Sequence, residues 1–185
     1  LLTGYASRGD ERPKNFPSFR EYVQSKPESQ RWAIQNFHCK DDGAEIASAI
    51  RSGECVAVSD GSFKNAFGTA AFILQGKNEK GEIRSATVIP GDSEDQSAYR
   101  SELGGIYGIV TMIQALCEYY NISEGQAEIG CDGERVLRQC FKGGNAAPTA
   151  AQFDLISAIR ATISKVPIRW KGRWVRGHQD NYFGP

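Results

Sequence analysis

The chain has 185 residues, of which 40% are hydrophobic and 24% are charged, and its formal net charge is zero. This length and composition are typical of one soluble globular domain with an appendage. No stretch approaches the roughly 18 apolar residues that a membrane-spanning helix needs, and no signal-peptide pattern opens the chain. The sequence therefore argues against a membrane protein and against a secreted one.

The cysteines and histidines indicate the cellular location of the protein and whether it can bind zinc. The five cysteines are an odd number and form no C-x-x-C pair, so we expect reduced, mostly buried thiols and an intracellular location, in the cytoplasm or nucleus. With only His38 and His178 available as imidazole ligands, a zinc site is not expected. The chain begins at Leu1 and its only methionine is Met112, so we expect a piece of a longer protein.

Charge is unevenly distributed along the sequence. Residues 155–177 hold six basic residues and no acidic one, whereas residues 92–134 hold nine acidic residues and one basic residue, Arg100. An acidic zone beside a basic zone would suit a metal-dependent site next to a track for phosphates. Ordinary solvated charge on separate faces explains the same pattern equally well at this point.

The first 42 residues differ in character from the rest. They are polar and are interrupted by prolines, with room for short helices at Phe19–Gln24 and Gln30–Phe37. We expect residues 1–42 to be a linker or the tail of a preceding domain, with a few apolar side chains that pack on the domain after it. We expect residues 43–185 to be the globular domain, truncated at its C-terminal end.

Hydrophobic periodicity predicts an α/β domain. Runs of period two predict five strands, at Cys55–Ser62, Gly68–Gly76, Ile83–Ile89, Gln126–Cys131 and Ile168–Val175. Steps of three and four predict helices at Asp42–Gly53, Ser97–Tyr120, Arg135–Phe141 and Phe153–Val166. Short links between the first three strands predict an antiparallel meander, so the whole is a five-stranded mixed sheet flanked by helices. Three glycines inside the long helix predict that it approaches the sheet closely.

Two strands end in the same unusual way. Asp60 and Asp132 each stand where an apolar strand gives way to glycine, and a lone Asp in such a run needs a partner. A carboxylate that only caps the turn through Gly61 is the simpler explanation of Asp60 taken alone. If the two strands are neighbours, the carboxylates lie close together, and Glu102 in the long helix can reach them. Three such carboxylates repel one another unless a divalent cation such as Mg²⁺ or Mn²⁺ binds them.

At this point the sequence resembles the ribonuclease H domains, most of all those of retroelement and reverse transcriptase polyproteins. The resemblance covers about residues 54–180 and rests on four short motifs in the family's order: residues 59–62 with 67–72, 99–103, 132–134, and 174–178. Each motif is weak alone, and their order makes the combination specific. The order Asp, Glu, Asp also differs from that of transposase and integrase relatives, in which the Glu comes last.

The resemblance implies an activity and a site. The implied reaction is hydrolysis of the RNA strand of an RNA–DNA hybrid, with two Mg²⁺ ions, replaceable by Mn²⁺, held by Asp60, Glu102 and Asp132. His178 would assist product release or proton transfer. An adjoining reverse transcriptase domain is the implied partner. Backbone groups and side chains around both strand ends are the implied substrate contacts, namely Gly61, Ser62, Arg100, Gly133 and Glu134.

The resemblance fails at the C-terminal end. The family's fourth acidic residue opens a closing helix beyond the histidine, but only seven residues follow His178. Either Asp180 takes this fourth role or, as we favour, the ligand lies beyond Pro185. The long basic handle of some bacterial members is also missing, because residues 143–151 contain no Lys or Arg.

Several alternatives stay open at the level of sequence. His178 can be an ordinary turn residue. Trp170 and Trp174 can stack on bases, although core packing is the better expectation for both. The whole domain can be a catalytically weak or inactive nucleic-acid-binding scaffold, or a nuclease that cuts DNA.

Overall fold

The computed structural model of the chain describes residues 16–141 and 152–175. Within these residues the strands are β1 (Phe37–His38), β2 (Cys55–Lys64), β3 (Phe67–Gln75), β4 (Glu82–Val88), β5 (Gln126–Cys131) and β6 (Arg169–Trp174). The helices are α2 (Phe19–Gln24), α3 (Glu28–Arg31), α4 (Ala44–Ser52), α5 (Ala98–Tyr119), α6 (Glu134–Phe141) and α7 (Phe153–Lys165), with a 3₁₀ turn at Lys77–Glu79.

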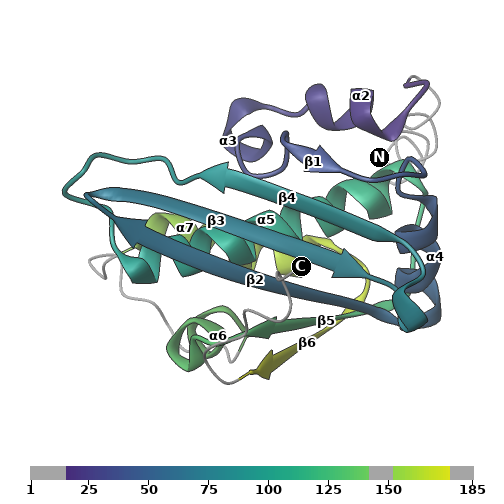
Figure 1. Cartoon of the computed structure of the whole chain (residues 1–185). Helices are drawn as coiled ribbons and strands as arrows, with labels where there is room; N and C mark the ends of the chain where they lie inside the picture. Colours follow the sequence, from purple (N-terminus) through teal and green to yellow (C-terminus); the bar gives the residue numbers. More distant parts are fainter. Residues whose placement is uncertain (1–15, 142–151, 176–185) are drawn as a thin grey trace, which may run out of the picture.

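The described strands form one mixed sheet in the order β1-β4-β3-β2-β5-β6 (Figure 1). The expected meander is confirmed, because β2, β3 and β4 pair antiparallel in sequence order. After α5 the chain returns to add β5 parallel to β2, and β6 parallel to β5. The predicted mixed α/β fold is thus confirmed, with six strands in place of five in the described part of the chain.

The sixth strand replaces part of an expected helix. The sequence predicts a helix over Gln30–Phe37, but α3 begins earlier, after Pro27, and Phe37 and His38 pair with β4. Proline favours the start of a helix, which moves the helix toward the N-terminus. A two-residue strand has no alternation that sequence periodicity can detect.

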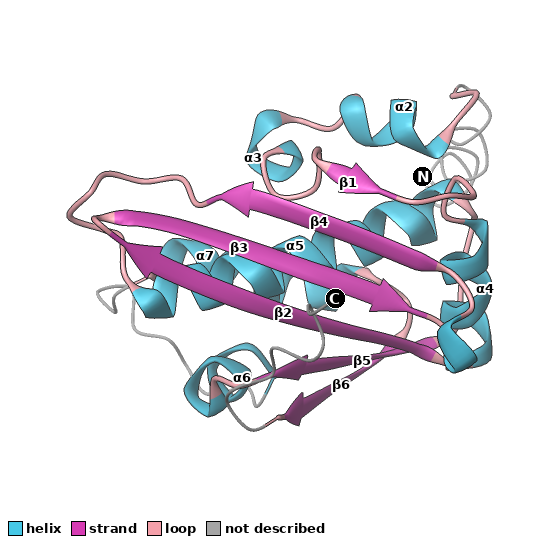
Figure 2. Cartoon of the chain, in the orientation of Figure 1, coloured by secondary structure: helices cyan, strands magenta, loops and turns pink. Residues whose placement is uncertain are grey.

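Helix α5 packs on β2 and β3, and α7 packs against α5 on the same side of the sheet (Figure 2). Glycines on α5 allow the close approach that the sequence predicts: a Cβ atom on Gly105 would lie 2.9 Å from Cβ of Ser59, and one on Gly108 would lie 2.6 Å from a ring carbon of Phe72. Real Cβ atoms essentially never approach this closely, so these glycines let the helix backbone rest on β2 and β3. These contacts fix the distance between α5 and the sheet. Glu102 lies near the start of the same helix.

Residues 16–42 share the hydrophobic core of the rest of the described chain. Phe19, Val23, Ile34 and Phe37 are buried in the same cluster as the apolar residues of α5 and the sheet. The α2 helix begins with Ser18, whose hydroxyl accepts a hydrogen bond from the Glu21 amide. A domain boundary near residue 42 stays a prediction, and the hydrophobic core does not stop there.

The cysteine prediction agrees with the described structure. Cys55, Cys117, Cys131 and Cys140 are buried free thiols, and Cys39 is partly exposed. Burial raises the pKa of each of the four buried thiols to about 12. Separately, no helix in residues 16–141 and 152–175 combines the length and the apolar character needed to cross a membrane.

Candidate functional site

The two strands associated with Asp60 and Asp132 are direct neighbours. The expectation that the chain turns at Gly61 was wrong, because β2 continues to Lys64 and Asp60 pairs with Ala71 inside it. Strands β2 and β5 run parallel, with Val56 beside Glu128 and Val58 beside Gly130. Continued by two residues, this register sets Asp60 beside Asp132. Adjacent strands lie about 4.8 Å apart, so both residues lie where β5 ends, beside the middle of β2. The sequence prediction that required these strands to be neighbours is confirmed.

Helix α5 brings Glu102 to the same part of the sheet. The backbone of Gly61 lies so close to α5 that a Cβ atom there would be 2.6 Å from the Glu102 amide nitrogen. The Ser101 hydroxyl donates a hydrogen bond to the Ser62 carbonyl at 2.9 Å, which ties the first turn of α5 to β2. Gly61 and Ser62, predicted as substrate contacts, therefore hold the helix that carries Glu102.

The carboxylate of Glu102 reaches the turn after β5. A Cβ atom on Gly133 would lie 2.6 Å from Oε2 of Glu102. Glycine at this position leaves the space that the carboxylate fills. Glu102 thus lies between the middle of β2, where Gly61 follows Asp60, and Gly133, which follows Asp132.

Electrostatics connect the three carboxylates. Partial burial raises the pKa of Glu102, and the negative charges of Asp132 and Asp60 raise this pKa further. Asp60 and Asp132 themselves are exposed to solvent. The three carboxylates form a local concentration of negative charge. Binding of a cation or a proton relieves their mutual repulsion.

The described carboxylates do not by themselves form a group that could hold a metal ion. In residues 16–141 and 152–175, no group of three or more His, Cys, Asp or Glu side chains is arranged so that it could hold a metal ion. The three carboxylates interact electrostatically without forming a closed coordination shell. Their chemistry nevertheless fits Mg²⁺ or Mn²⁺, because both ions prefer carboxylate oxygen and because the three charges repel one another.

Strand β6 supports the backbone at Asp132. Nε1 of Trp174 donates a hydrogen bond to the Asp132 carbonyl at 3.0 Å, and the Val175 amide donates to the Cys131 carbonyl at 2.9 Å. Trp170 packs against the core as expected, but the expectation was wrong for Trp174, whose exposed fraction is 51%. Alternation along a strand could not distinguish the two, because only Trp174 lies at the strand's end.

Arg100 has a different environment from the one that the sequence suggests. It is buried, and its guanidinium makes five hydrogen bonds to protein acceptors on three residues: the carbonyl of Pro90, the side-chain oxygen of Gln152 and the carboxylate of Asp154. An arginine guanidinium has five N–H donors. With its donors engaged, Arg100 joins the start of α5 to α7, and a structural role replaces the predicted substrate contact.

The remaining predicted residues lie at or beyond the edge of the described site. Glu134 is the first residue of α6 and is exposed. His178 and Asp180 lie outside the described residues, so their predicted roles stay predictions.

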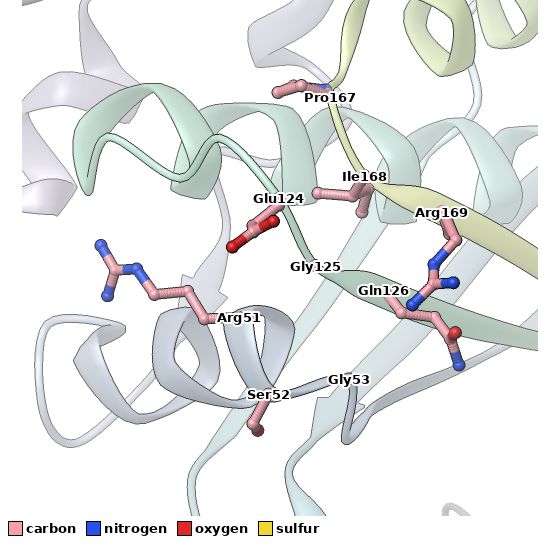
Figure 3. Close-up of a pocket in the computed structure, with 9 residues that line it drawn as sticks. All are labelled: Arg51, Ser52, Gly53, Glu124, Gly125, Gln126, Pro167, Ile168 and Arg169. Carbon is pink, nitrogen blue, oxygen red and sulfur yellow. The ribbon is translucent and has the colours of Figure 1, made fainter.

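A cleft lies at the other end of β5, where β5 and β6 begin and α4 ends (Figure 3). Its volume is about 570 Å³, and it contains none of the three carboxylates. It is lined by Arg51, Ser52, Gly53, Glu124, Gly125, Gln126, Pro167, Ile168 and Arg169. Sequence periodicity does not indicate this cleft, because its lining comes from the ends of separate elements.

Solved structures of ribonucleases H share this architecture. LC11-RNase H1 in complex with an RNA/DNA hybrid matches with a TM-score of 0.52 and 8% identity, over 70% of this chain and 90% of that one. LC11-RNase H1 isolated from compost by a metagenomic approach matches with a TM-score of 0.52 and 11% identity, over 70% and 89%. RNase H1 of Halobacterium salinarum NRC-1 matches with a TM-score of 0.49 and 12% identity, over 70% and 90%.

Sequence comparison finds no matching family model and no matching curated protein. At 8% and 11% identity, the two structures with a TM-score of 0.52 are evidence for the fold alone. Together with the strand order, the parallel β2–β5 pair and the position of α5, they lead to one conclusion: the chain has the ribonuclease H-like fold.

Proposed function

We propose that this chain is a metal-dependent endoribonuclease that hydrolyses the RNA strand of RNA–DNA hybrids. The observation that carries the proposal is the position of Glu102, whose carboxylate lies against Gly133 and whose pKa is raised by burial, by Asp132 and by Asp60. A further support is a solved structure with the same fold, LC11-RNase H1, which is described in complex with an RNA/DNA hybrid.

The residues suited to hold Mg²⁺ or Mn²⁺ are Asp60, Glu102 and Asp132. A fourth ligand is Asp180 or a residue beyond Pro185. Divalent ions bound at such a site lower the pKa of an attacking water and stabilise the charge on the leaving oxygen.

The chain's own groups have separate tasks in this proposal. Gly61 lets the backbone of α5 approach β2 at Glu102, and Gly133 leaves the space that the Glu102 carboxylate occupies. Backbone groups near Ser62 and Glu134 contact the substrate, where the 2′-hydroxyl distinguishes RNA from DNA. His178 accepts or delivers a proton near the leaving strand, or assists product release.

The biological setting of the proposal comes from the sequence motifs alone. We propose that the chain is the ribonuclease H part of a reverse transcriptase or retrotransposon polyprotein, and that it acts inside the cell. An adjoining reverse transcriptase domain would then strengthen its grip on the hybrid.

The test is cleavage of a hybrid whose RNA and DNA strands carry different labels. The chain is incubated with Mg²⁺, with Mn²⁺ or with a chelator, beside an Asp60→Asn variant. We expect metal-dependent cutting of the RNA strand that the variant abolishes. Cutting of DNA in a DNA duplex would contradict the proposed substrate and indicate a DNA-directed nuclease.

A second candidate function is a catalytically weak or inactive scaffold that binds nucleic acid. One observation favours it: in the described part of the chain, the carboxylates do not form a group that could hold a metal ion. The same assay on a chain extended past Pro185 separates the two functions. Cutting by the extended chain supports the nuclease, and hybrid binding without cutting by both chains supports the scaffold.

A further inference from the structure

Strand β6 carries three cations on one face. Side chains two residues apart point to the same side of a strand, so Arg169, Lys171 and Arg173 share a face. We call these three residues the β6 stripe. All three are exposed. The opposite face at Gly172 is covered by α6, because a Cβ atom there would lie 3.1 Å from the ring of Phe141.

The positive charge of the β6 stripe is only partly neutralised. Glu128 on the neighbouring strand lies 3.9 Å from Nζ of Lys171 and 3.7 Å from Nε of Arg173. Arg169 is paired in register with Gln126, which has no charge, and it forms no ion pair with any described residue. Three positive charges therefore face one negative charge. Ion pairs between exposed side chains at such distances contribute little free energy.

The β6 stripe connects the two features already described. At one end, Arg173 lies beside Gly130, two residues before Asp132, and the next residue, Trp174, bonds to the Asp132 carbonyl. At the other end, Arg169 borders the cleft that also contains Arg51 (Figure 3). From Arg169 to Arg173 the strand rises about 13 Å, at about 3.3 Å per residue.

We infer that the β6 stripe is a binding track for the phosphate backbone of the nucleic acid, leading from the candidate site toward the cleft. The inference rests on the proposed function and adds where the substrate is held. A length of about 13 Å corresponds to about four base steps of a duplex, at about 3.4 Å of rise per phosphate on each strand. A row of exposed cations contacts phosphates without reading sequence.

The test is the salt dependence of hybrid binding, measured without divalent ions so that no cleavage occurs. The variant carries Arg169→Gln, Lys171→Gln and Arg173→Gln. The matched control carries Lys77→Gln, Lys80→Gln and Arg84→Gln, which remove the same charge near the β3–β4 turn. For three lost phosphate contacts, we expect the slope of log affinity against log salt to fall by about 2.7, with the control unchanged.

Four outcomes would overturn the inference. These are an unchanged slope in the stripe variant, an equal fall in the control, no hybrid binding by the wild type, and displacement of the hybrid by polyglutamate as effectively as by unlabelled hybrid. The last result would assign the stripe to an acidic protein partner. The single change Arg169→Gln breaks no described ion pair, and its expected slope change of about 0.9 serves if the triple variant unfolds.

This experiment is independent of catalysis. Hybrid binding that depends on the β6 stripe, with no cleavage in Mg²⁺ or Mn²⁺ by this chain or by the chain extended past Pro185, would contradict the proposed nuclease function and leave the track intact. Cleavage by the stripe variant at the wild-type rate would support the nuclease function and contradict the track.

Discussion

At the scale of single residues, the absence of a side chain at Gly133 decides where Glu102 can lie. Its backbone torsion is not in the left-handed region, so an alanine there meets no backbone strain. Among the described residues, the only atom within 3 Å of such a methyl group is Oε2 of Glu102, at the far end of a flexible side chain. A methyl group would therefore move the carboxylate at little cost in stability.

The corresponding prediction concerns Gly133→Ala. We expect cleavage of the hybrid to fall about 100-fold, since a displacement of about 1 Å at a catalytic group can cost that much. The free energy of unfolding should change by less than about 1 kcal/mol. The control is Gly130→Ala, whose Cβ atom would meet its nearest neighbour at an ordinary 3.5 Å. Equal cleavage by Gly133→Ala and wild type would contradict the assigned position of Glu102.

At the scale of elements, Arg100 holds α5 and α7 together beneath the candidate site. Its guanidinium lies 3.1 Å from the Asp154 carboxylate on α7 and also bonds the Pro90 carbonyl that precedes α5. Arg100 and these two acceptors come from three separate segments: α5, the residues before α5, and α7. The guanidinium is buried, whereas Pro90 and Asp154 are exposed. Loss of this side chain therefore removes the hydrogen bonds and the ion pair that join the two helices, and their relative position depends on it.

We therefore expect Arg100→Ala to destabilise the fold by about 2 kcal/mol, because hydrogen bonds that involve a charged group are typically worth about 1.5–3 kcal/mol. Denaturant unfolding measures this change. Hybrid affinity, compared at a temperature where both proteins are folded, should stay within about twofold of wild type. A large loss of affinity with unchanged stability would restore the substrate contact that the sequence suggests.

The Arg100–Asp154 pair also predicts a pH dependence of stability. Partial burial acts to raise the pKa of Asp154, but the hydrogen bond and charge of Arg100 outweigh it and lower this pKa below its ordinary value of 3.8. The pair thus stabilises the fold fully above that ordinary value, and the contribution is lost as the pH falls through the lowered pKa.

The measurement compares wild type with Asp154→Asn by denaturant unfolding across this range. We expect wild type to be the more stable protein near neutral pH, with the difference shrinking as the solution becomes more acidic than the ordinary Asp pKa. A difference that stays constant or grows toward acid would mean that Arg100 does not stabilise the charged form of Asp154.

At the scale of the whole molecule, residues 16–42 complete the hydrophobic core. Tyr22 and Phe19 are buried against the C-terminal part of α5, and the aromatic rings of Trp32 and Tyr107 stack at 5.4 Å. The Phe19 amide also donates to the Asp42 carboxylate. We expect a chain that begins at residue 43 to aggregate or unfold, and one that begins at residue 16 to fold.

Thermal unfolding and solubility of the two truncated chains check this prediction. The shorter chain exposes apolar surface on α5 and β4 that Phe19, Ile34 and Phe37 cover in the described structure. A cooperative unfolding transition for the chain that begins at residue 43 would support the predicted domain boundary there.

Much of this architecture is predictable from local pattern. Strands with clear alternation and the long amphipathic α5 agree with their predicted positions to within about two residues, because burial of one face sets their periodicity. The neighbourhood of Asp60 and Asp132 is indicated by two apolar runs that each lead into Asp-Gly, although β2 itself continues to Lys64. Strand β1 is too short for periodicity to reveal.

Other features depend on contacts between distant segments, and local sequence does not reveal them. The binding partners of Arg100 lie up to 54 residues away, at Asp154, so nothing near Arg100 indicates that it is buried. The exposure of Trp174 depends on where β6 ends relative to Asp132. The cleft at Arg51 and Arg169 is likewise formed only when three separate elements meet.

The most direct test of the central claim is calorimetric titration of Mn²⁺ into wild type and into Glu102→Gln. The claim is that Asp60, Glu102 and Asp132 act as one site for a divalent cation. We predict saturable binding to wild type that the variant weakens at least about tenfold, because removal of one charge from a shared site reduces the attraction for the ion. No saturable binding to wild type, or equal binding to both proteins, would contradict the claim.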